Sequence, residues 1–206
     1  MRYILIAAAS VALATTAQAQ TITRNPSEVR AGTYVLDPAH GKITWSLSHL
    51  GFSTYVGQFS DVSATLKLDP RKATDSQLEA TVQTASAGTL NAMLDKHLQS
   101  ADFFDVANHP TATFRASQIK LVDQDTAEVT GALTLRGVTR TITMIADFNQ
   151  AGTSPVDGKY TLGFDGRAVI KRSDYGINYA LPVLGDEVTL HFEAEFKLQD
   201  APKVGK

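Results

Sequence analysis

The sequence contains few residues that could perform catalysis, and their spacing matches no complete catalytic motif. It has no cysteine, which excludes disulfides, thiolate metal sites and a cysteine nucleophile. Ser117 and Lys120 have the S-x-x-K spacing of some serine hydrolases, but they lie in strand-like alternation and lack the partner motifs. Asp102 and Asp105 could form an acid–base pair, yet turn capping beside the intervening phenylalanines accounts for them. The sequence therefore predicts no catalytic residue.

The remaining polar candidates are suited to binding. The five histidines show no paired metal-ligand spacing, so neither a metal nor another cofactor is predicted. His49 ends a predicted strand on its inward side, where the ring could hydrogen-bond to a ligand head group or support the turn. Arg172 and Asp174 follow Ile170 at the end of another predicted strand, where a head-group contact competes with an ion pair or turn contact. These three side chains are the candidates for the mouth of a binding site.

The composition is that of one soluble folded domain. Of the 206 residues, 43% are hydrophobic and 19% are charged, and the net charge is -2. The chain has no basic run that could neutralise a nucleic-acid backbone or an anionic membrane surface. Nucleic acid is therefore not expected as a partner.

Residues 1–19 have the pattern of a secretory signal peptide. Arg2 precedes a short apolar run, and Ala17 and Ala19 are the small residues that a signal peptidase reads. A membrane-spanning helix would need about 20 apolar residues, which makes an anchor the weaker interpretation. We predict cleavage after Ala19 and export to a bacterial periplasm, because an exported chain without cysteine suits that compartment.

From residue 33 onwards the hydrophobic pattern alternates, as in strands with one buried face. The clearest run is 42–49, in which Ile43, Trp45 and Leu47 share the inward side. Similar runs, separated by turn residues, occupy 34–36, 56–68, 78–82, 112–116, 129–135, 142–148, 160–170 and 188–198. Most connections are too short for a crossover helix, so these runs are counted as about eight antiparallel strands. The fold class is predicted to be all-β, an eight-stranded antiparallel lipocalin-like barrel. The barrel is expected to span 33–200, between a polar lead (20–32) and a flexible tail (201–206).

One segment, residues 89–105, departs from the alternation and is predicted to form a short helix and a lid. Thr89 is placed to cap the helix, which ends near Ser100. The apolar residues of this helix form one stripe at i, i+3, i+4 and i+8: Leu90, Met93, Leu94 and Leu98. Phe103 and Phe104 follow directly, and because exposing both rings to water would be costly, this segment is expected to cover an apolar surface.

Small residues recur on the predicted inward faces. They are Ala80, Ala112, Ala116, Gly131, Ala146, Gly166, Ala168 and Ala194. Two interpretations stay open: the small residues leave an apolar tunnel, or they alternate with large residues to fit the taper of a filled barrel.

Several ordered blocks of the chain resemble a known family. They are Leu36-Asp37-Pro38-Ala39-His40, His49-Leu50-Gly51-Phe52, Gly57-Gln58-Phe59, Asp102-Phe103-Phe104-Asp105, Arg172-Ser173-Asp174-Tyr175-Gly176-Ile177 and Gly185-Asp186-Glu187-Val188. Together they resemble the YceI-like family of periplasmic, lipocalin-like polyisoprenoid-binding proteins, over roughly 33–198. The resemblance implies an extended barrel whose pore holds a long isoprenoid or a similar amphiphile, with no established catalytic role.

The ligand-lining residues are assigned from inward alternation and from the lid. The predicted lipid contacts are Trp45, Leu47, Phe52, Phe59, Leu94, Leu98, Phe103, Phe104, Phe114, Met144, Phe164, Ala168, Ile170 and Phe192. The expected partner is a polyisoprenoid, an isoprenoid quinone or a related lipid. Whether the chain is a monomer or a homodimer stays open.

Two alternatives to a lipid carrier remain at this stage. The chain could be a structural or stress-related periplasmic barrel without a dedicated ligand. It could also be an eight-stranded outer-membrane barrel, but charged residues on the non-core faces would then meet lipid at about 2 to 4 kcal/mol each. For that reason we do not expect an integral membrane protein.

Overall fold

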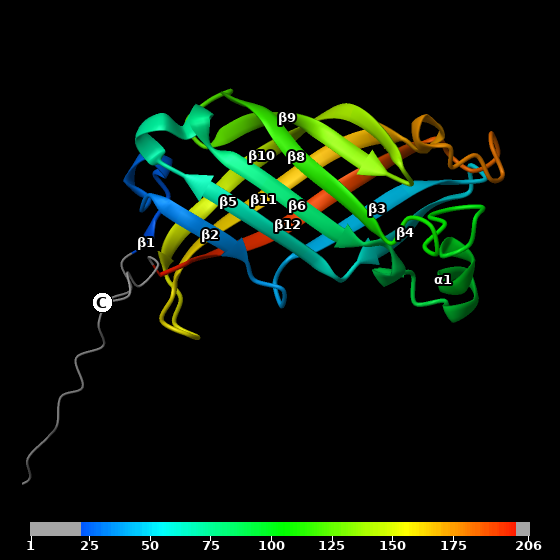
Figure 1. Ribbon diagram of the computed structural model, residues 1–206, viewed down its shortest axis with the longest axis horizontal. Helices are drawn as coiled ribbons and strands as arrows, with labels where there is room; N and C mark the ends of the chain where they lie inside the picture. Colours follow the sequence, from blue (N-terminus) through cyan, green and yellow to red (C-terminus); the bar gives the residue numbers. More distant parts are fainter. Residues whose placement is uncertain (1–21, 201–206) are drawn as a thin grey trace, which may run out of the picture.

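In the computed structural model, which describes residues 22–200, the alternating segments form antiparallel strands that close into a barrel (Figure 1). The strands are β1 (Ile22–Thr23), β2 (Gly32–Leu36), β3 (Lys42–His49), β4 (Ser53–Phe59), β5 (Val62–Leu68), β6 (Gln77–Gln83), β7 (Ala87–Gly88), β8 (Thr111–Leu121), β9 (Thr126–Leu135), β10 (Val138–Thr153), β11 (Tyr160–Lys171) and β12 (Glu187–Leu198). The order β10-β9-β8-β6-β5-β2-β12 is closed by β11, which pairs with both β10 and β12. The predicted eight-stranded all-β barrel is confirmed.

Two of the eight barrel strands are each divided into two segments. Together with the short strands β1 and β7, this division gives the twelve strands β1 to β12. The β12 strand pairs with β3 through residues 189–193 and with β2 through residues 196–198, so β2 and β3 are two parts of one barrel strand. Pro38 breaks the ladder between them because it has no N–H to donate, and the Asp37 carboxylate accepts a hydrogen bond from the Ala39 N–H at 3.1 Å. Strands β4 and β5 form a second composite strand, which pairs with β3 and β2 respectively.

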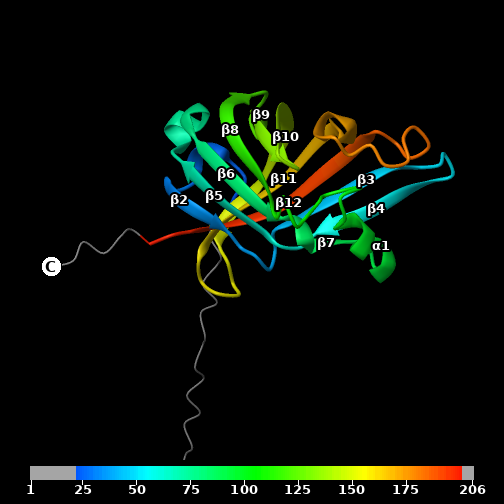
Figure 2. The same ribbon diagram turned by 45° about the vertical axis from the view of Figure 1, so that its right-hand side comes forward.

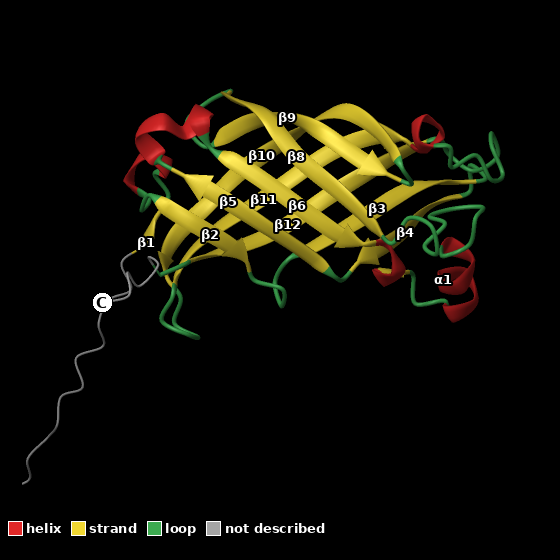
Figure 3. Cartoon of the chain, in the orientation of Figure 1, coloured by secondary structure: helices red, strands yellow, loops and turns green. Residues whose placement is uncertain are grey.

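Short helices lie at the two ends of the barrel (Figure 3). They are η1 (Pro26–Glu28), η2 (Pro70–Asp75), η3 (Thr84–Ser86), α1 (Ala92–Leu98) and η4 (Arg172–Tyr175). One end, called here the far end, carries η1 and η2, and the other, called the lid end, carries α1 and η4.

The segment expected to be a polar lead is part of the fold. Ile22 and Thr23 pair with β10 as strand β1, and Val29 is buried in the core. Asn25 caps η1 by accepting a hydrogen bond from the Ser27 N–H at 3.1 Å. The predicted signal peptide (1–19) and flexible tail (201–206) lie outside the described residues.

Helix α1 is present, but it begins later than predicted. Asn91 caps it by accepting hydrogen bonds from the backbone N–H groups of Met93 and Leu94, both at 3.2 Å. The prediction of Thr89 as the cap is wrong: Leu90 has a φ of 63°, which takes the chain out of helical geometry. Thr89 instead donates to the Asp95 carboxylate from its N–H and its hydroxyl, at 2.7 and 2.6 Å. Leu90 and Met93, which belong to the predicted apolar stripe, are exposed.

Candidate functional site

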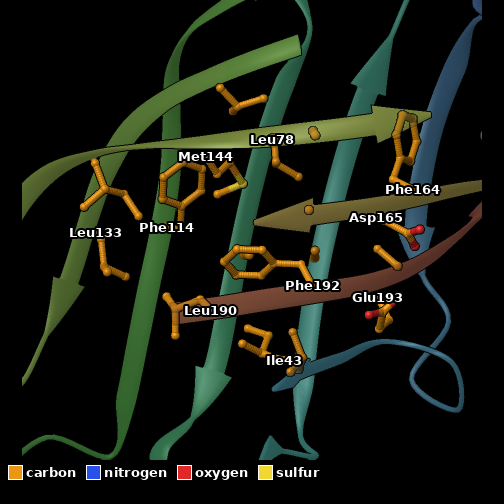
Figure 4. Close-up of a pocket in the computed structure, with 18 of the residues that line it drawn as sticks. Ile43, Leu78, Phe114, Leu133, Met144, Phe164, Asp165, Leu190, Phe192 and Glu193 are labelled. Carbon is orange, nitrogen blue, oxygen red and sulfur yellow. The ribbon is translucent and has the colours of Figure 1, made fainter. Parts of the chain in front are cut away.

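A long apolar cavity of about 830 Å³ occupies the barrel. Figure 4 shows part of it, where side chains from strands on all sides of the wall converge: Ile43, Leu78, Phe114, Leu133, Met144, Phe164, Leu190 and Phe192. These side chains are inward because successive residues of a strand alternate between the two faces of the sheet. The interior is therefore a hydrocarbon-lined space.

The cavity reaches both ends of the barrel. Asn25 and Ser27 of the η1 region border it at the far end, and His97 and Tyr179 border it at the lid end. Strand β12 has 12 residues, and at about 3.3 Å per residue and a tilt of roughly 40° the wall is on the order of 30 Å long. A ligand that filled this space would be elongated.

All but two of the predicted lipid contacts border the cavity. Those that do are Trp45, Leu47, Phe59, Leu94, Leu98, Phe103, Phe104, Phe114, Met144, Phe164, Ile170 and Phe192. Their placement agrees with the predicted inward faces, whereas their contact with a lipid remains a prediction.

The structure places Phe52 and Ala168 away from the cavity. Phe52 follows the turn at Leu50 and Gly51, whose φ angles of 55° and 74° close the β3–β4 hairpin beyond the barrel wall, and its ring is exposed. Ala168 does point inward, but it is buried in a cluster with Phe114, Val129 and Met144 and does not border the cavity. The prediction that these two residues line the cavity is therefore wrong.

Both interpretations of the small inward residues apply, at different places. Ala80, Ala112, Ala146, Gly166 and Ala194 border the cavity, which is the tunnel interpretation. Gly131 instead makes room for a ring: a Cβ atom there would lie 2.5 Å from Cζ of Phe114. Large side chains thus fill the barrel beside Gly131, and small ones leave it open elsewhere.

Arg172 borders the lid end of the cavity and organises it through backbone carbonyls. Its guanidinium is buried and donates hydrogen bonds to the carbonyl oxygens of Gly185, Ile177, Tyr179 and Leu184, at 2.8 to 3.0 Å. Burial lowers the pKa of Arg172, while the nearby charge of Asp186 opposes this effect. Arg172 therefore holds residues 176–184, called here the mouth loop, across the end of the barrel.

The carboxylate that joins the two segments flanking this loop is Asp186 and not the predicted Asp174. Asp174 is exposed and does not border the cavity. Asp186 accepts hydrogen bonds from the Ser173 N–H at 2.9 Å and from its hydroxyl at 2.8 Å. Burial alone would raise the pKa of Asp186, but these two bonds and the Arg172 charge lower it. The acceptor was not identifiable from spacing because it lies 13 residues after its donor.

An aromatic cluster joins the lid (89–105) to the mouth loop. Phe103 of this cluster was predicted as a site residue, whereas His97 and Tyr179 were not. The ring of His97 lies 5.0 Å from that of Phe103 and 4.9 Å from that of Tyr179, and the latter two rings are 5.2 Å apart. Phe104 contacts Phe59 of the wall with ring centroids 5.3 Å apart. The lid thus covers the cavity, as its adjacent phenylalanines predicted.

Arg136 connects the lid to the mouth loop. It lies in the β9–β10 turn, and its guanidinium donates to the carbonyl oxygen of Ala101 in the lid at 2.6 Å and to that of Gly176. Its partners are 35 and 40 residues away, so no local pattern identified it.

His49 borders the cavity at the lid end, with its ring centroid 5.8 Å from that of Tyr55. Its backbone forms a β-bridge with Leu184 of the mouth loop. It therefore occupies the predicted position at the mouth of the cavity.

A second polar cluster lies outside the cavity and has the character of an ion-pair network. Asp37, His40 and Glu195 place their ligand atoms within 4.8 Å of one another. The Lys197 ammonium lies 2.7 Å from the Asp37 carboxylate and 2.6 Å from that of Asp157. Hydrogen bonds from Lys197 and His40 hold the pKa of Asp37 well below its usual value, and those to Asp157 and Asp37 raise the pKa of Lys197 to about 12. An ammonium already supplies the positive charge, so we assign this cluster a structural role.

Within residues 22–200, no helix has both the length and the hydrophobicity needed to cross a lipid bilayer.

Curated proteins from several bacteria are similar to this chain over most of its length. A UPF0312 protein of Azotobacter vinelandii is 38% identical over 170 residues, which cover 82% of this chain and 88% of that protein. A UPF0312 protein of Pseudomonas aeruginosa is 36% identical over 170 residues with the same coverage.

Solved structures share the fold. BcnA of Burkholderia cenocepacia has a TM-score of 0.71 at 29% identity, covering 78% of this chain and 98% of that one. The YCEI protein of Campylobacter jejuni has a TM-score of 0.67 at 33% identity, with coverages of 74% and 90%. A polyisoprenoid binding domain from Saccharophagus degradans has a TM-score of 0.61 at 15% identity, covering 82% of this chain and all 100% of that domain, which supports the fold alone. The YceI-like domain model matches residues 34–196, and the chain accordingly belongs to the YceI-like family.

Proposed function

We propose that this protein is a non-catalytic carrier that holds a long amphiphilic lipid, such as a polyisoprenoid or an isoprenoid quinone, in its barrel. The observation that supports this most strongly is the continuous apolar cavity between η1 and the lid. Removing apolar surface from water is favourable by about 25 cal/mol per Å². A hydrocarbon chain gains this energy along the whole wall, whereas a small polar ligand would leave most of the lining without a partner.

The family points in the same direction. Membership of the YceI-like family and the polyisoprenoid binding domain of Saccharophagus degradans suggest a lipid-binding role rather than catalysis. An outer-membrane barrel would have the opposite distribution of residues, with a polar interior and an apolar band outside. The apolar interior therefore favours the carrier.

The head group is proposed to lie at the lid end, beside His49. The Arg172 guanidinium is already engaged by backbone carbonyls, so His49 is the remaining candidate for a head-group contact among the three predicted mouth residues. Its imidazole can donate or accept a hydrogen bond. His49→Leu should weaken retention of a lipid with a polar head more than retention of a plain hydrocarbon probe.

The direct test is mass spectrometry of an organic extract of protein purified from its native cells. A long-chain lipid in stoichiometric amount is the expected result. An empty barrel that also fails to take up an isoprenoid quinone added to the purified protein would refute the carrier proposal, and would favour a structural or stress-related barrel.

The carrier is proposed to act in the periplasm after removal of residues 1–19. Sequencing the N-terminus of protein recovered from cells should find Gln20 first, because the apolar run ends at Ala17 and Ala19. Recovery of the folded protein with Met1 intact would contradict this part of the proposal.

A further inference from the structure

Large apolar side chains are exposed around the lid end of the barrel. The lid-end rim, as we call it, consists of Leu50 and Phe52 at the β3–β4 tip, Leu90 and Met93 on the lid, and Val183 in the mouth loop. Leu90 is fully exposed at 101%, Phe52 is 89% exposed and Met93 is 84% exposed. Exposed apolar groups of this kind mark contact surfaces when they gather in one place.

Contacts between the three segments show that they form one rim. The Leu50 N–H donates to the Val183 carbonyl at 3.2 Å, which ties the hairpin tip to the mouth loop. The His97 ring, on the same helix as Met93, contacts Tyr179 of the mouth loop. Figures 1 and 2 show the β3–β4 tip, the mouth loop and α1 together at the same end in both views.

Both leucines of the rim are exposed and adopt a backbone conformation that is unfavourable for leucine. Leu50 and Leu90 have φ angles of 55° and 63°, in the left-handed region where glycine, asparagine or aspartate is favoured. Neither side chain reaches the core. Leu90 is strained and fully exposed, and Leu50 is strained and 47% exposed, so folding stability alone does not explain a leucine at either position.

The rim has the character of a lipid-binding surface. A stable protein interface uses about 20 to 30 residues a side, whereas this rim offers separate apolar tips around an opening, which is sufficient for insertion into the interface of a bilayer. The apolar lining also continues outwards: Tyr179 and Leu94 border the cavity next to the exposed mouth loop and Met93. With a net charge of -2 and no basic run, attachment must depend on apolar insertion.

We propose that the lid end docks on the surface of a lipid bilayer, with the rim side chains inserted at the boundary between the lipid head groups and the acyl chains. This inference rests on the proposed carrier function. Docking joins the cavity to the hydrocarbon of the bilayer at the place where the lid and the mouth loop meet. A lipid can then enter or leave without crossing water.

The test is co-sedimentation with phosphatidylcholine vesicles, using protein recovered from cells so that all variants share the same N-terminus. Phe52→Ser combined with Met93→Ser should reduce partitioning at least tenfold for each side chain, roughly the factor that corresponds to burying a large apolar group. Raised salt should have little effect, because screening acts on charge attraction. The matched control is Val156→Ser, which removes a side chain that is 87% exposed on the β10–β11 hairpin at the far end.

Three results would overturn the proposal. The rim variant could partition like the unaltered protein, the Val156→Ser control could lose as much, or the rim variant could change only the sedimentation of a dimer, which would assign the rim to contacts between copies. The denaturant midpoint should stay unchanged, since both side chains are exposed.

The carrier function is separated from docking by a cavity variant. Ala194→Leu should lower the lipid content and leave vesicle partitioning intact. If no variant ever carries lipid and the rim variant still loses vesicle binding, the carrier proposal fails and docking stands.

Discussion

Ala194→Leu offers a sharp test of whether the barrel is hollow. Ala194 borders the cavity on β12, opposite Phe164 of β11. The substitution adds three carbon atoms to the interior. In a hollow barrel each added buried CH₂ contributes up to about 0.8 kcal/mol. The lipid-free protein should therefore keep its stability or gain up to about 2.4 kcal/mol, while the added bulk occupies space that the lipid uses.

The matched control is Ala168→Leu on the neighbouring strand. Ala168 points inward as Ala194 does, but it is 4% exposed, is packed in a cluster with Phe114 and Met144, and does not border the cavity. The same added atoms should there cause overpacking that costs about 1 to 3 kcal/mol. The two variants are thus expected to change stability with opposite sign, or at least by clearly different amounts.

The assay has two readouts for each variant: bound lipid per chain, from mass spectrometry of an extract, and the denaturant midpoint of delipidated protein. Ala194→Leu should lower the amount of bound lipid per chain and preserve the denaturant midpoint of the delipidated protein. A loss of stability equal to that of Ala168→Leu, with normal lipid content, would show that the barrel is packed at Ala194 and would refute the reasoning.

Three further predictions concern the lid and the ion-pair network. Replacing Phe103 and Phe104 by Ser should speed the release of bound lipid more than it lowers stability; an unchanged release rate with a large loss of stability would make both rings core residues. Arg136→Met should also speed lipid release, because it removes the two hydrogen bonds by which Arg136 holds the lid and the mouth loop together. Amide hydrogen exchange in 89–105 should rise, and unchanged exchange would contradict this role. Because Lys197 and His40 lower the pKa of Asp37 in the folded state, the contribution of Asp37 to stability is complete at neutral pH and is lost progressively below about pH 4. Lys197→Met should weaken this acid dependence, and a denaturation series across pH 2 to 7 that shows the same slope in both proteins would contradict it.

The alternation of side chains allowed much of the fold to be predicted. A strand has a period of two residues, so Ile43, Trp45 and Leu47 had to share one face, and burial of that face determined the inward side of the barrel. The same period placed Phe164, Ile170 and the other wall residues at the cavity before any contact was known. The lid was also predictable, because Phe103 and Phe104 needed an apolar surface to cover.

Local pattern was insufficient wherever turn geometry or a neighbouring side chain decided the outcome. Phe52 was predicted to contact lipid as part of the block His49-Leu50-Gly51-Phe52, but it follows the left-handed turn at Leu50 and Gly51 and its ring is exposed to solvent. Parity placed Ala168 inward correctly, yet it is buried in a cluster with Phe114, Val129 and Met144 and does not border the cavity. Asn91 caps helix α1 in place of the predicted Thr89, because the left-handed φ of Leu90 prevents the helix from beginning there.

The residues that close the lid end were decided by tertiary structure alone. Arg136 bonds to Ala101 and Gly176, and the ring of Tyr179 meets that of His97 edge to face, across separations of tens of residues. Whether small inward residues leave a cavity is likewise a property of all eight strands at once, since each strand contributes only one part of the wall. The sequence alone determined which side chains face inward. How much space they leave, and what closes its ends, depends on distances between segments that only the folded barrel brings together.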